Sequence, residues 1–197
     1  WREQTYPQWV KENVVHVGMS KALSTNITHF MALKTTAELA LELGKVNEFK
    51  YYYELASDLK ASINKYFWDE SKGLYSTFIV TYLDQTKIDK YDLLGNSMAI
   101  LFDIAVTERQ KNALENYPMV MAGAPVIAPQ DSQTPIYHNR GIWPFVTQYG
   151  LLAAKKSKQA KIYNHLFDSM IRGTSLNLSN MENYEFLSMN NWFDDGI

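Results

Sequence analysis

The spacing of apolar residues predicts two long helices in the first third of the chain. Over 46–67, apolar side chains recur at intervals of three and four residues, which places them on one helical face. That face comprises Phe49, Tyr52, Tyr53, Ala56, Leu59, Ile63 and Phe67. A preceding helix is expected over 26–43, with Ser24 or Thr25 as its cap and Gly44 as its stop. Because the linker Gly44-Lys45 is so short, the two helices must run antiparallel as an αα-hairpin.

The middle of the chain alternates short extended segments with shorter helices. A turn is expected over 69–73, and β-branched and aromatic residues over 74–82 predict one or two strands. Asp92 can cap a helix over 93–106, and a shorter helix is expected over 107–116.

A proline-rich stretch separates these elements from a second hairpin. Residues 117–136 hold four of the six prolines and predict a long irregular loop. Loops of this length are uncommon unless they serve a site. The second hairpin is expected over 143–155 and 157–172, ending near Gly173. Residues 174–197 show no periodicity and are expected to be loop or extended chain.

Composition and charge narrow the class of protein. Of 197 residues, 46% are hydrophobic and 20% are charged, as in soluble globular domains. The net charge of -2 gives no electrostatic reason to bind nucleic acid or an anionic membrane. No apolar run approaches the roughly 20 residues of a membrane span. The sequence carries no recognisable targeting signal, so the location stays open between cytoplasmic and periplasmic or secreted.

The sequence lacks the familiar motifs for metals and cofactors. There is no cysteine, and the four histidines do not have the spacing of a zinc site. A hard cation bound by oxygen atoms of Asp side chains and backbone carbonyls is not excluded by the sequence. No Gly-rich phosphate loop, Gly-x-Ser-x-Gly elbow or dinucleotide fingerprint is present. We therefore predict neither a metal nor a cofactor.

The segment Tyr137-His138-Asn139-Arg140-Gly141-Ile142-Trp143-Pro144-Phe145 carries the most informative chemistry of the chain. Pro144 can open a helix, because the N–H that it lacks would have no intrahelical partner. Flat aromatic rings beside His138, Asn139 and Arg140 suit a sugar, which has apolar C–H faces and many hydroxyls. Composition alone favours the alternative, in which this is an aromatic helix start packed into a core.

Three further segments accompany this one in a familiar order. They are Trp1-Arg2-Glu3-Gln4-Thr5-Tyr6-Pro7, Tyr66-Phe67-Trp68-Asp69-Glu70-Ser71-Lys72-Gly73-Leu74-Tyr75 and Asn180-Met181-Glu182-Asn183-Tyr184-Glu185-Phe186. Together with the aromatic segment they resemble inverting glycosidases built on an (α/α)6 toroid, particularly glycoside hydrolase family 63 and its relatives. The resemblance implies an all-α fold of αα-hairpins that form part of an (α/α)6 toroid, with minor β-strands between hairpins.

The same resemblance implies roles for individual residues. Glu182 would be the general base, and Asn and Tyr side chains beside it could hydrogen-bond its carboxylate. The residues expected to contact the sugar are Trp1, Arg2, Tyr137, His138, Asn139 and Trp143. The general acid would be an Asp located before Trp1. Glu3 lies within the first motif, and we interpret it as a structural partner of Arg2.

The function implied is inverting hydrolysis of an α-linked glucoside or mannoside within an oligosaccharide or glycan, by an enzyme of bacterial type. A closed toroid of six hairpins needs twelve helices, and this chain supplies about half of them. Trp1 begins inside a motif, and the sequence ends just after Trp192-Phe193-Asp194-Asp195-Gly196. We therefore expect residues 1–197 to form one partial catalytic domain, truncated at both ends and inactive alone. Its partner would be the remainder of the same toroid.

Two other functions fit the same residues. A sugar epimerase or a polysaccharide lyase on the same toroid would use His or Tyr as its acid and base. A non-catalytic helical domain could bind glycans or a protein partner through the aromatic loop without needing an acid.

Overall fold

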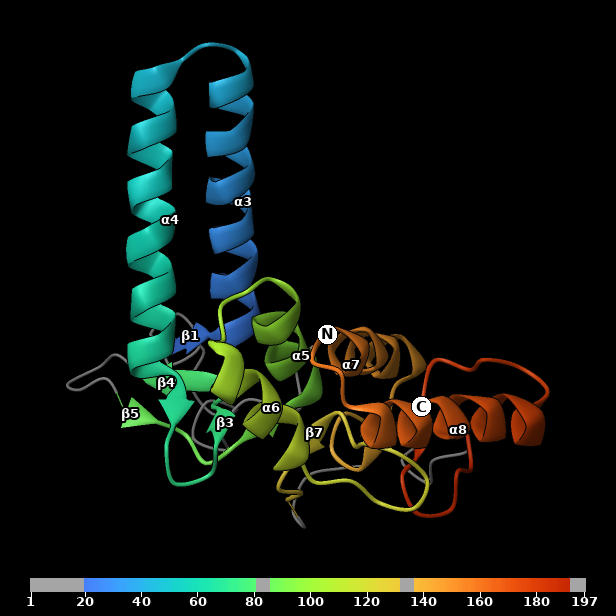
Figure 1. The fold of residues 1–197 in the computed structure, drawn as a ribbon. Helices are drawn as coiled ribbons and strands as arrows, with labels where there is room; N and C mark the ends of the chain where they lie inside the picture. The colour runs from blue at the N-terminus through green and yellow to red at the C-terminus, as the bar shows by residue number, and fades with distance from the viewer. Residues whose placement is uncertain (1–19, 81–85, 132–136, 192–197) are drawn as a thin grey trace.

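The computed structural model describes residues 20–80, 86–131 and 137–191, and it is built mainly from helices joined by short strands (Figure 1). The helices in these ranges are α3 (Leu23–Glu42), α4 (Val46–Tyr66), α5 (Leu93–Leu101), α6 (Thr107–Glu115), α7 (Pro144–Lys156) and α8 (Ala160–Asn177). The strands are β1 (Ser20–Ala22), β2 (Trp68–Asp69), β3 (Leu74–Tyr75), β4 (Phe78–Val80), β5 (Thr86–Lys87), β6 (Tyr91–Asp92), β7 (Ile127–Ala128), β8 (Gly141–Ile142) and β9 (Tyr184–Glu185). The predicted all-α class with minor β-strands is confirmed.

Helices α3 and α4 form the expected antiparallel hairpin, which extends away from the other elements (Figure 1). Gly44 ends α3 as predicted, with a left-handed φ of +72° and an N–H that donates to the Leu41 carbonyl at 3.0 Å. The predicted start was wrong. The helix begins at Leu23 without a side-chain cap, because the Leu23 N–H donates to the Thr77 carbonyl at 2.9 Å. Pairing of β1 with β4 therefore sets this end.

Helix α5 lies at the centre of the hydrophobic core, with every residue from Leu93 to Ile100 buried. Asp92 caps it as predicted, accepting a hydrogen bond from the Gly95 N–H at 2.6 Å. The helix ends at Leu101 rather than near residue 106. Lys156 at the end of α7 contacts both the Leu101 carbonyl, at 2.8 Å, and the Asp103 carboxylate, at 2.7 Å. Asp103 itself has a left-handed φ of 58°, so the backbone leaves the helix there.

Helices α7 and α8 form the second hairpin (Figure 1). Proline opens α7 as predicted. Helix α8 runs past Gly173 to Asn177, so the predicted stop was wrong. A Cβ on Gly173 would lie 2.7 Å from the ring of Tyr184, so this glycine leaves room for a buried aromatic side chain instead of ending the helix. Leu178, with a left-handed φ of 54°, follows the last turn.

Short antiparallel strands connect loops that are far apart in the sequence. Over 117–131, the described part of the predicted loop, the chain is irregular apart from β7, which pairs with β6, and an isolated bridge between Val120 and Gly123. Strand β9 lies in the stretch expected to be loop or extended chain, and it pairs with β8 through Gly141 opposite Glu185 and Ile142 opposite Tyr184. This pairing places the aromatic loop before α7 beside the segment after α8.

Candidate functional site

The loop before α7 is a compact turn that only glycine permits at one position. The Tyr137 N–H donates to the Asn139 carbonyl at 3.3 Å, and Arg140 takes a left-handed φ of 70°. A Cβ on Gly141 would lie 1.9 Å from the Tyr137 carbonyl oxygen and 3.0 Å from the Trp143 indole nitrogen. The glycine therefore allows the chain to fold back on itself and to bring the rings of this loop together.

Four rings of this loop form one aromatic cluster. Trp143 is at its centre, with ring centroids 4.8 Å from His138, 5.0 Å from Tyr137 and 6.0 Å from Phe145. The His138 ring stacks on Trp143 with an interplanar angle of 18°. Trp143 is 4% exposed and His138 is fully buried, whereas Phe145 is 44% exposed. The helix-start alternative is therefore partly correct, since Trp143 and His138 are packed into the protein; their predicted contacts with sugar stay predictions.

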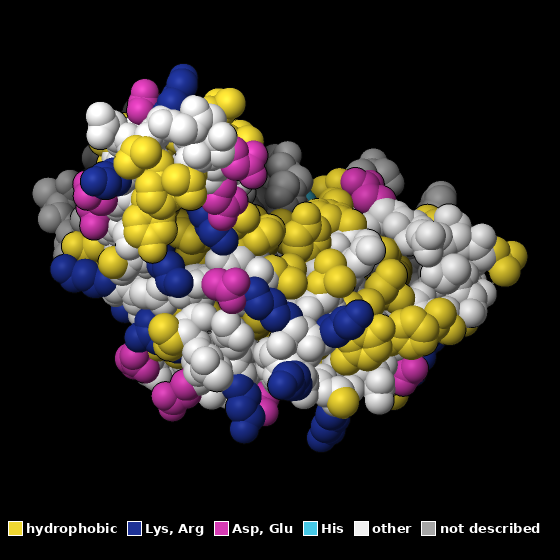
Figure 2. Space-filling view, turned by 45° about the horizontal axis from the view of Figure 1, so that its top comes forward, with side chains coloured by type: hydrophobic (Ala, Val, Ile, Leu, Met, Phe, Trp, Pro, Cys, Tyr) yellow, Lys and Arg dark blue, Asp and Glu magenta, His cyan; other side chains and the backbone are white. Residues whose placement is uncertain are grey.

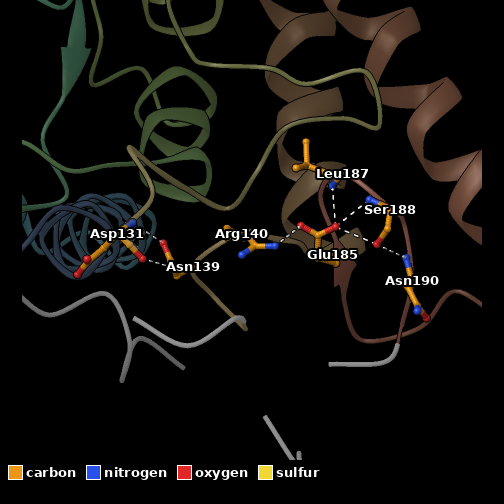
Figure 3. Close-up of polar contacts among 7 residues, drawn as sticks. All are labelled: Asp131, Asn139, Arg140, Glu185, Leu187, Ser188 and Asn190. Carbon is orange, nitrogen blue, oxygen red and sulfur yellow. Dashed lines mark hydrogen bonds and ion pairs between the residues drawn. The ribbon is translucent and has the colours of Figure 1, made fainter. Parts of the chain in front are cut away.

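Asn139 joins the aromatic loop to the end of the preceding loop. Its side-chain oxygen accepts from the Asp131 N–H at 2.8 Å, and its side-chain nitrogen donates to the Asp131 carbonyl at 2.7 Å (Figure 3). The amide is buried and both of its ends are occupied by backbone groups. In this structure Asn139 fixes the loop, and its proposed contact with substrate stays a prediction.

Glu182 lies opposite this loop, on the segment that β9 holds in place. Its side chain is exposed, and its Oε1 accepts a hydrogen bond from the Tyr137 hydroxyl at 3.3 Å. Two residues predicted to belong to the site, 45 positions apart in the sequence, are therefore brought together. The preceding residue, Met181, has a left-handed φ of 44°, which turns the chain immediately before the carboxylate.

The groups that hold Glu182 differ from the nearby Asn and Tyr suggested by the sequence. Tyr184 is buried, and its hydroxyl donates to the Ser169 carbonyl at 3.4 Å. Asn180 accepts instead from the Thr174 hydroxyl at 2.9 Å. The phenol that reaches Glu182 comes from Tyr137 on the other loop, whereas Tyr184 is buried against Gly173.

Glu185 is a second carboxylate beside this loop, and it was not among the predicted site residues. Its Oε2 accepts from the Leu187 N–H at 3.0 Å, the Ser188 N–H at 2.7 Å and the Ser188 hydroxyl at 2.8 Å. Its Oε1 pairs with the Arg140 guanidinium at 3.2 Å (Figure 3). Burial raises the pKa of Glu185, but these hydrogen bonds from Ser188, Leu187 and Arg140 outweigh it and leave the pKa below its ordinary value.

The site described above includes neither the first motif nor the cavity of the α7/α8 hairpin. Trp1 and Arg2 lie outside the described residues, as does Glu3. A cavity of about 800 Å³ lies at the opposite end of the α7/α8 hairpin, where Lys158 and His165 help to line it, and none of the predicted site residues borders it.

Within 20–80, 86–131 and 137–191, no group of three or more His, Cys, Asp or Glu side chains could hold a metal ion. No helix in these ranges has the length and apolar character needed to cross a membrane.

Three solved structures illustrate what the fold of this chain is similar to. Neutral trehalase Nth1 from Saccharomyces cerevisiae superposes with a TM-score of 0.69 at 14% identity, covering 87% of this chain and 35% of the trehalase. A protein titled sialidase superposes with a TM-score of 0.72 at 11% identity, covering 88% of this chain and 18% of the sialidase. A family 78 rhamnosidase of Bacillus sp. GL1 superposes with a TM-score of 0.55 at 22% identity, covering 85% of this chain and 16% of the rhamnosidase. These likenesses show the fold.

Sequence comparison identifies the family. A curated relative, N,N'-diacetylchitobiose phosphorylase of Vibrio proteolyticus, is 26% identical over 106 residues, which is 51% of this chain and 13% of that protein. The chain thus spans a small part of the relatives that it matches. The family model for the bacterial alpha-L-rhamnosidase 6 hairpin glycosidase domain matches residues 1–123. The resemblance to (α/α)6-toroid glycosidases is confirmed, and the chain belongs to the bacterial alpha-L-rhamnosidase six-hairpin glycosidase domain family.

Proposed function

We propose that this protein hydrolyses an α-linked glycoside with inversion of configuration and that Glu182 is its general base. The observation that carries the proposal is the hydrogen bond from the Tyr137 hydroxyl to the exposed Glu182 carboxylate, beside the aromatic cluster. A base must be ionised and must reach a water molecule. The hydrogen bond that Glu182 accepts from the described residues is to its Oε1, so its Oε2 can accept a proton from water.

An inverting mechanism also needs a general acid on the other face of the sugar. The two carboxyl groups of such enzymes lie roughly 6.5–9.5 Å apart, which leaves space for the attacking water. By the resemblance described above, the acid is an Asp in the segment preceding Trp1. Tyr137, one of the four rings of the aromatic cluster, orients the base and supplies an apolar face for the sugar.

We propose the α linkage of the substrate and leave its sugar to be determined by assay. The motifs at 137–144 and 180–186 favour an α-linked glucoside or mannoside. The name of the matching family favours an α-L-rhamnoside instead. Assays with 4-nitrophenyl α-D-glucoside, α-D-mannoside and α-L-rhamnoside separate these sugars directly, because each releases the same coloured product.

We also propose that further helical hairpins complete the ring around this site. Helix α7 exposes Phe145, Tyr149 and Leu152, spaced by four and three residues along one face. Helix α8 exposes Phe167 and Ile171 in the same way. Apolar stripes of this kind are buried by neighbouring hairpins in toroids. The solved relatives named above are much longer than this chain.

A second candidate is phosphorolysis, which the similarity to a chitobiose phosphorylase favours. Phosphate is already a nucleophile, so such an enzyme needs no base to deprotonate it. A glutamate side chain at the point of attack does not favour binding of a phosphate anion there, and this favours hydrolysis. Measuring turnover with and without inorganic phosphate distinguishes the two, since only the phosphorylase depends on it.

The central test is Glu182→Gln in the full-length protein. Glutamine keeps the size and shape of the side chain but removes the base, so binding should survive while kcat falls by about 10²–10⁴-fold. Glu54→Gln, which makes the same change on the exposed surface of α4, serves as the matched control. NMR of the first-formed anomer should show inversion, and retention of configuration would refute the mechanism.

The epimerase and lyase alternatives are tested with the same protein. They would use His138 as acid or base, although this side chain is fully buried in the structure. If His138→Ala abolishes turnover while Glu182→Gln leaves it intact, the hydrolase assignment fails. If neither change matters and no glycoside is cleaved, the non-catalytic binding domain becomes the better account.

A further inference from the structure

Two side-chain contacts cross between the aromatic loop and the segment after α8. Tyr137 donates to Glu182 at 3.3 Å, and Arg140 pairs with Glu185 at 3.2 Å. In both loops the second partner follows the first by three residues. The first contact is at the exposed surface, and the second involves the nearly buried Glu185 carboxylate, next to the β8–β9 pair.

Glu185 is unsuited to take part in proton transfer itself. Both of its oxygens are occupied, Oε2 by three donors from Leu187 and Ser188 and Oε1 by Arg140. Its side chain is only 9% exposed. A carboxylate that accepts this many hydrogen bonds stays ionised at neutral pH and has no oxygen left for water. Its contacts instead organise the turn that follows it.

Arg140 holds this turn through both its backbone and its side chain. Its carbonyl accepts the Phe186 N–H at 2.9 Å, and its guanidinium lies 5.9 Å from the centroid of the Phe186 ring. The backbone at Arg140 is left-handed, and its carbonyl and guanidinium bond to two adjacent residues, Phe186 and Glu185. The Glu185 N–H and carbonyl meanwhile bond to Asn190 and Met189 at 2.8 Å each. The pair therefore joins two tightly turned loops at one point.

We propose that the Arg140–Glu185 ion pair is a positioning pair, which fixes the loop of Glu182 against the loop of Tyr137 and so sets where the base lies. This rests on the proposed function, in which Glu182 is the base. Neither residue touches substrate; both act through Glu182. A displacement of about 1 Å at a reacting group can cost on the order of 10²-fold in rate. Breaking the pair should thus lower kcat without weakening substrate binding.

The experiment is a double-mutant cycle in the full-length protein. Glu185→Gln, Glu182→Gln and the double variant are assayed on whichever of the three 4-nitrophenyl α-glycosides the wild type cleaves. Glu185→Gln alone should lower kcat by about 10–100-fold, with KM within about threefold of the wild type. In the Glu182→Gln background the same change should add less than about twofold, because a positioning residue has nothing left to position.

A matched control comes from another ion pair of the same chain. Glu70 pairs with Arg109 at 2.9 Å on the surface, with 79% of its side chain exposed. Glu70→Gln makes the same change in charge and should leave kcat within about twofold. Losses that multiply in the double variant would show that Glu185 acts independently of Glu182 and would overturn the proposal. An unchanged kcat in Glu185→Gln would overturn it as well.

Folding and function are kept apart by a second variant. If Glu185→Gln lowers the melting temperature strongly, the cycle is repeated with Arg140→Lys, which keeps the charge but loses the planar fork that reaches Glu185. The same lack of additivity is expected, and additive losses there would overturn the proposal. Full turnover by Glu182→Gln refutes the proposed function and this inference together, whereas loss in Glu182→Gln with no effect of Glu185→Gln refutes this inference alone.

Discussion

At the scale of single residues, Glu182 and Glu185 lie three positions apart in one segment, yet their carboxylates differ in exposure and in hydrogen bonding. Glu182 is exposed and has one described hydrogen-bond donor, the Tyr137 hydroxyl. Glu185 is buried and receives bonds from Ser188, Leu187 and Arg140. The sequence singled out the first because of its motif. The second left a fainter signal in Ser188, which follows three residues later, where a hydroxyl and backbone N–H groups can meet a carboxylate.

The lowered pKa of Glu185 leads to a prediction about stability and pH. The folded pKa lies below the unfolded value of 4.5, so Glu185 stabilises the fold above that pH, and this contribution is lost as the pH falls through the folded pKa. At pH 7, Glu185→Gln should lower the free energy of unfolding by about 2 kcal/mol, typical of hydrogen bonds to a charged group. Urea unfolding of both proteins between pH 7 and pH 3 measures the difference. It should shrink below pH 4.5, and a constant or growing difference would contradict the assignment.

At the scale of elements, Gly173 governs how α8 supports the site. The ring of Tyr184 lies against this glycine, and Tyr184 is the residue before Glu185 in β9. Gly173→Ala would place a Cβ 2.7 Å from two ring carbons and the hydroxyl oxygen of the buried Tyr184. Overpacking of this kind costs about 1–3 kcal/mol and outweighs the gain in helix propensity of about 1 kcal/mol. We expect a net loss in the free energy of unfolding.

Gly150 in the interior of α7 is the matched control for this prediction. A Cβ there would lie 3.0 Å from a terminal methyl of Leu166, a flexible side chain that can move by a few tenths of an ångström. Gly150→Ala should therefore stay within about 1 kcal/mol of the wild type. Thermal or urea unfolding of both variants compares them. Equal effects of the two substitutions would show that the Tyr184 ring does not require Gly173.

At the scale of the whole molecule, the exposed apolar side chains stand out. Figure 2 shows hydrophobic side chains gathered at the end of the α3/α4 hairpin and across other parts of the same face. The larger exposed hydrophobic residues of that hairpin are Leu39, Leu41, Leu43, Val46, Tyr51, Tyr53 and Leu55. Exposed apolar side chains gathered in this way mark a place where something else packs. The proposed further hairpins of the ring would cover it.

These surfaces predict how the 197 residues behave when they are produced alone. The chain should self-associate, which sedimentation velocity would detect as a sedimentation coefficient that rises with concentration. Leu43→Glu combined with Tyr53→Lys should reduce the association, because both side chains are more than half exposed on the hairpin. Thr36→Glu on the polar surface of α3 is the control. A monomer at all concentrations would mean that these faces need no partner.

The same proposal predicts that the isolated chain has no measurable hydrolase activity. Acid and base must act on one bond, and loss of the acid alone typically removes about 10²–10⁴-fold of the rate. Assays with the three 4-nitrophenyl α-glycosides at high protein concentration test this. Robust hydrolysis by these residues alone would place the acid within them and refute its assignment to the preceding segment.

Much of the fold could be predicted because its signals are local. The stripe from Phe49 to Phe67, the stop at Gly44 and the cap at Asp92 each depend on residues within one or two turns, and the structure has all three elements in place. Helix starts and ends failed where a distant group decided them. Thr77 receives the first N–H of α3, and Lys156 meets the end of α5, contacts that no local pattern contains.

The helical class, the hairpins and the segments that carry the candidate chemistry follow from local patterns, because periodicity, caps and turn residues act over short distances along the chain. Which of those residues meet depends on long-range packing. Tyr137 reaches Glu182, and Arg140 reaches Glu185, across 45 positions. These contacts exist because β8 pairs with β9 and Tyr184 packs against Gly173, and such long-range packing leaves no pattern in a single sequence.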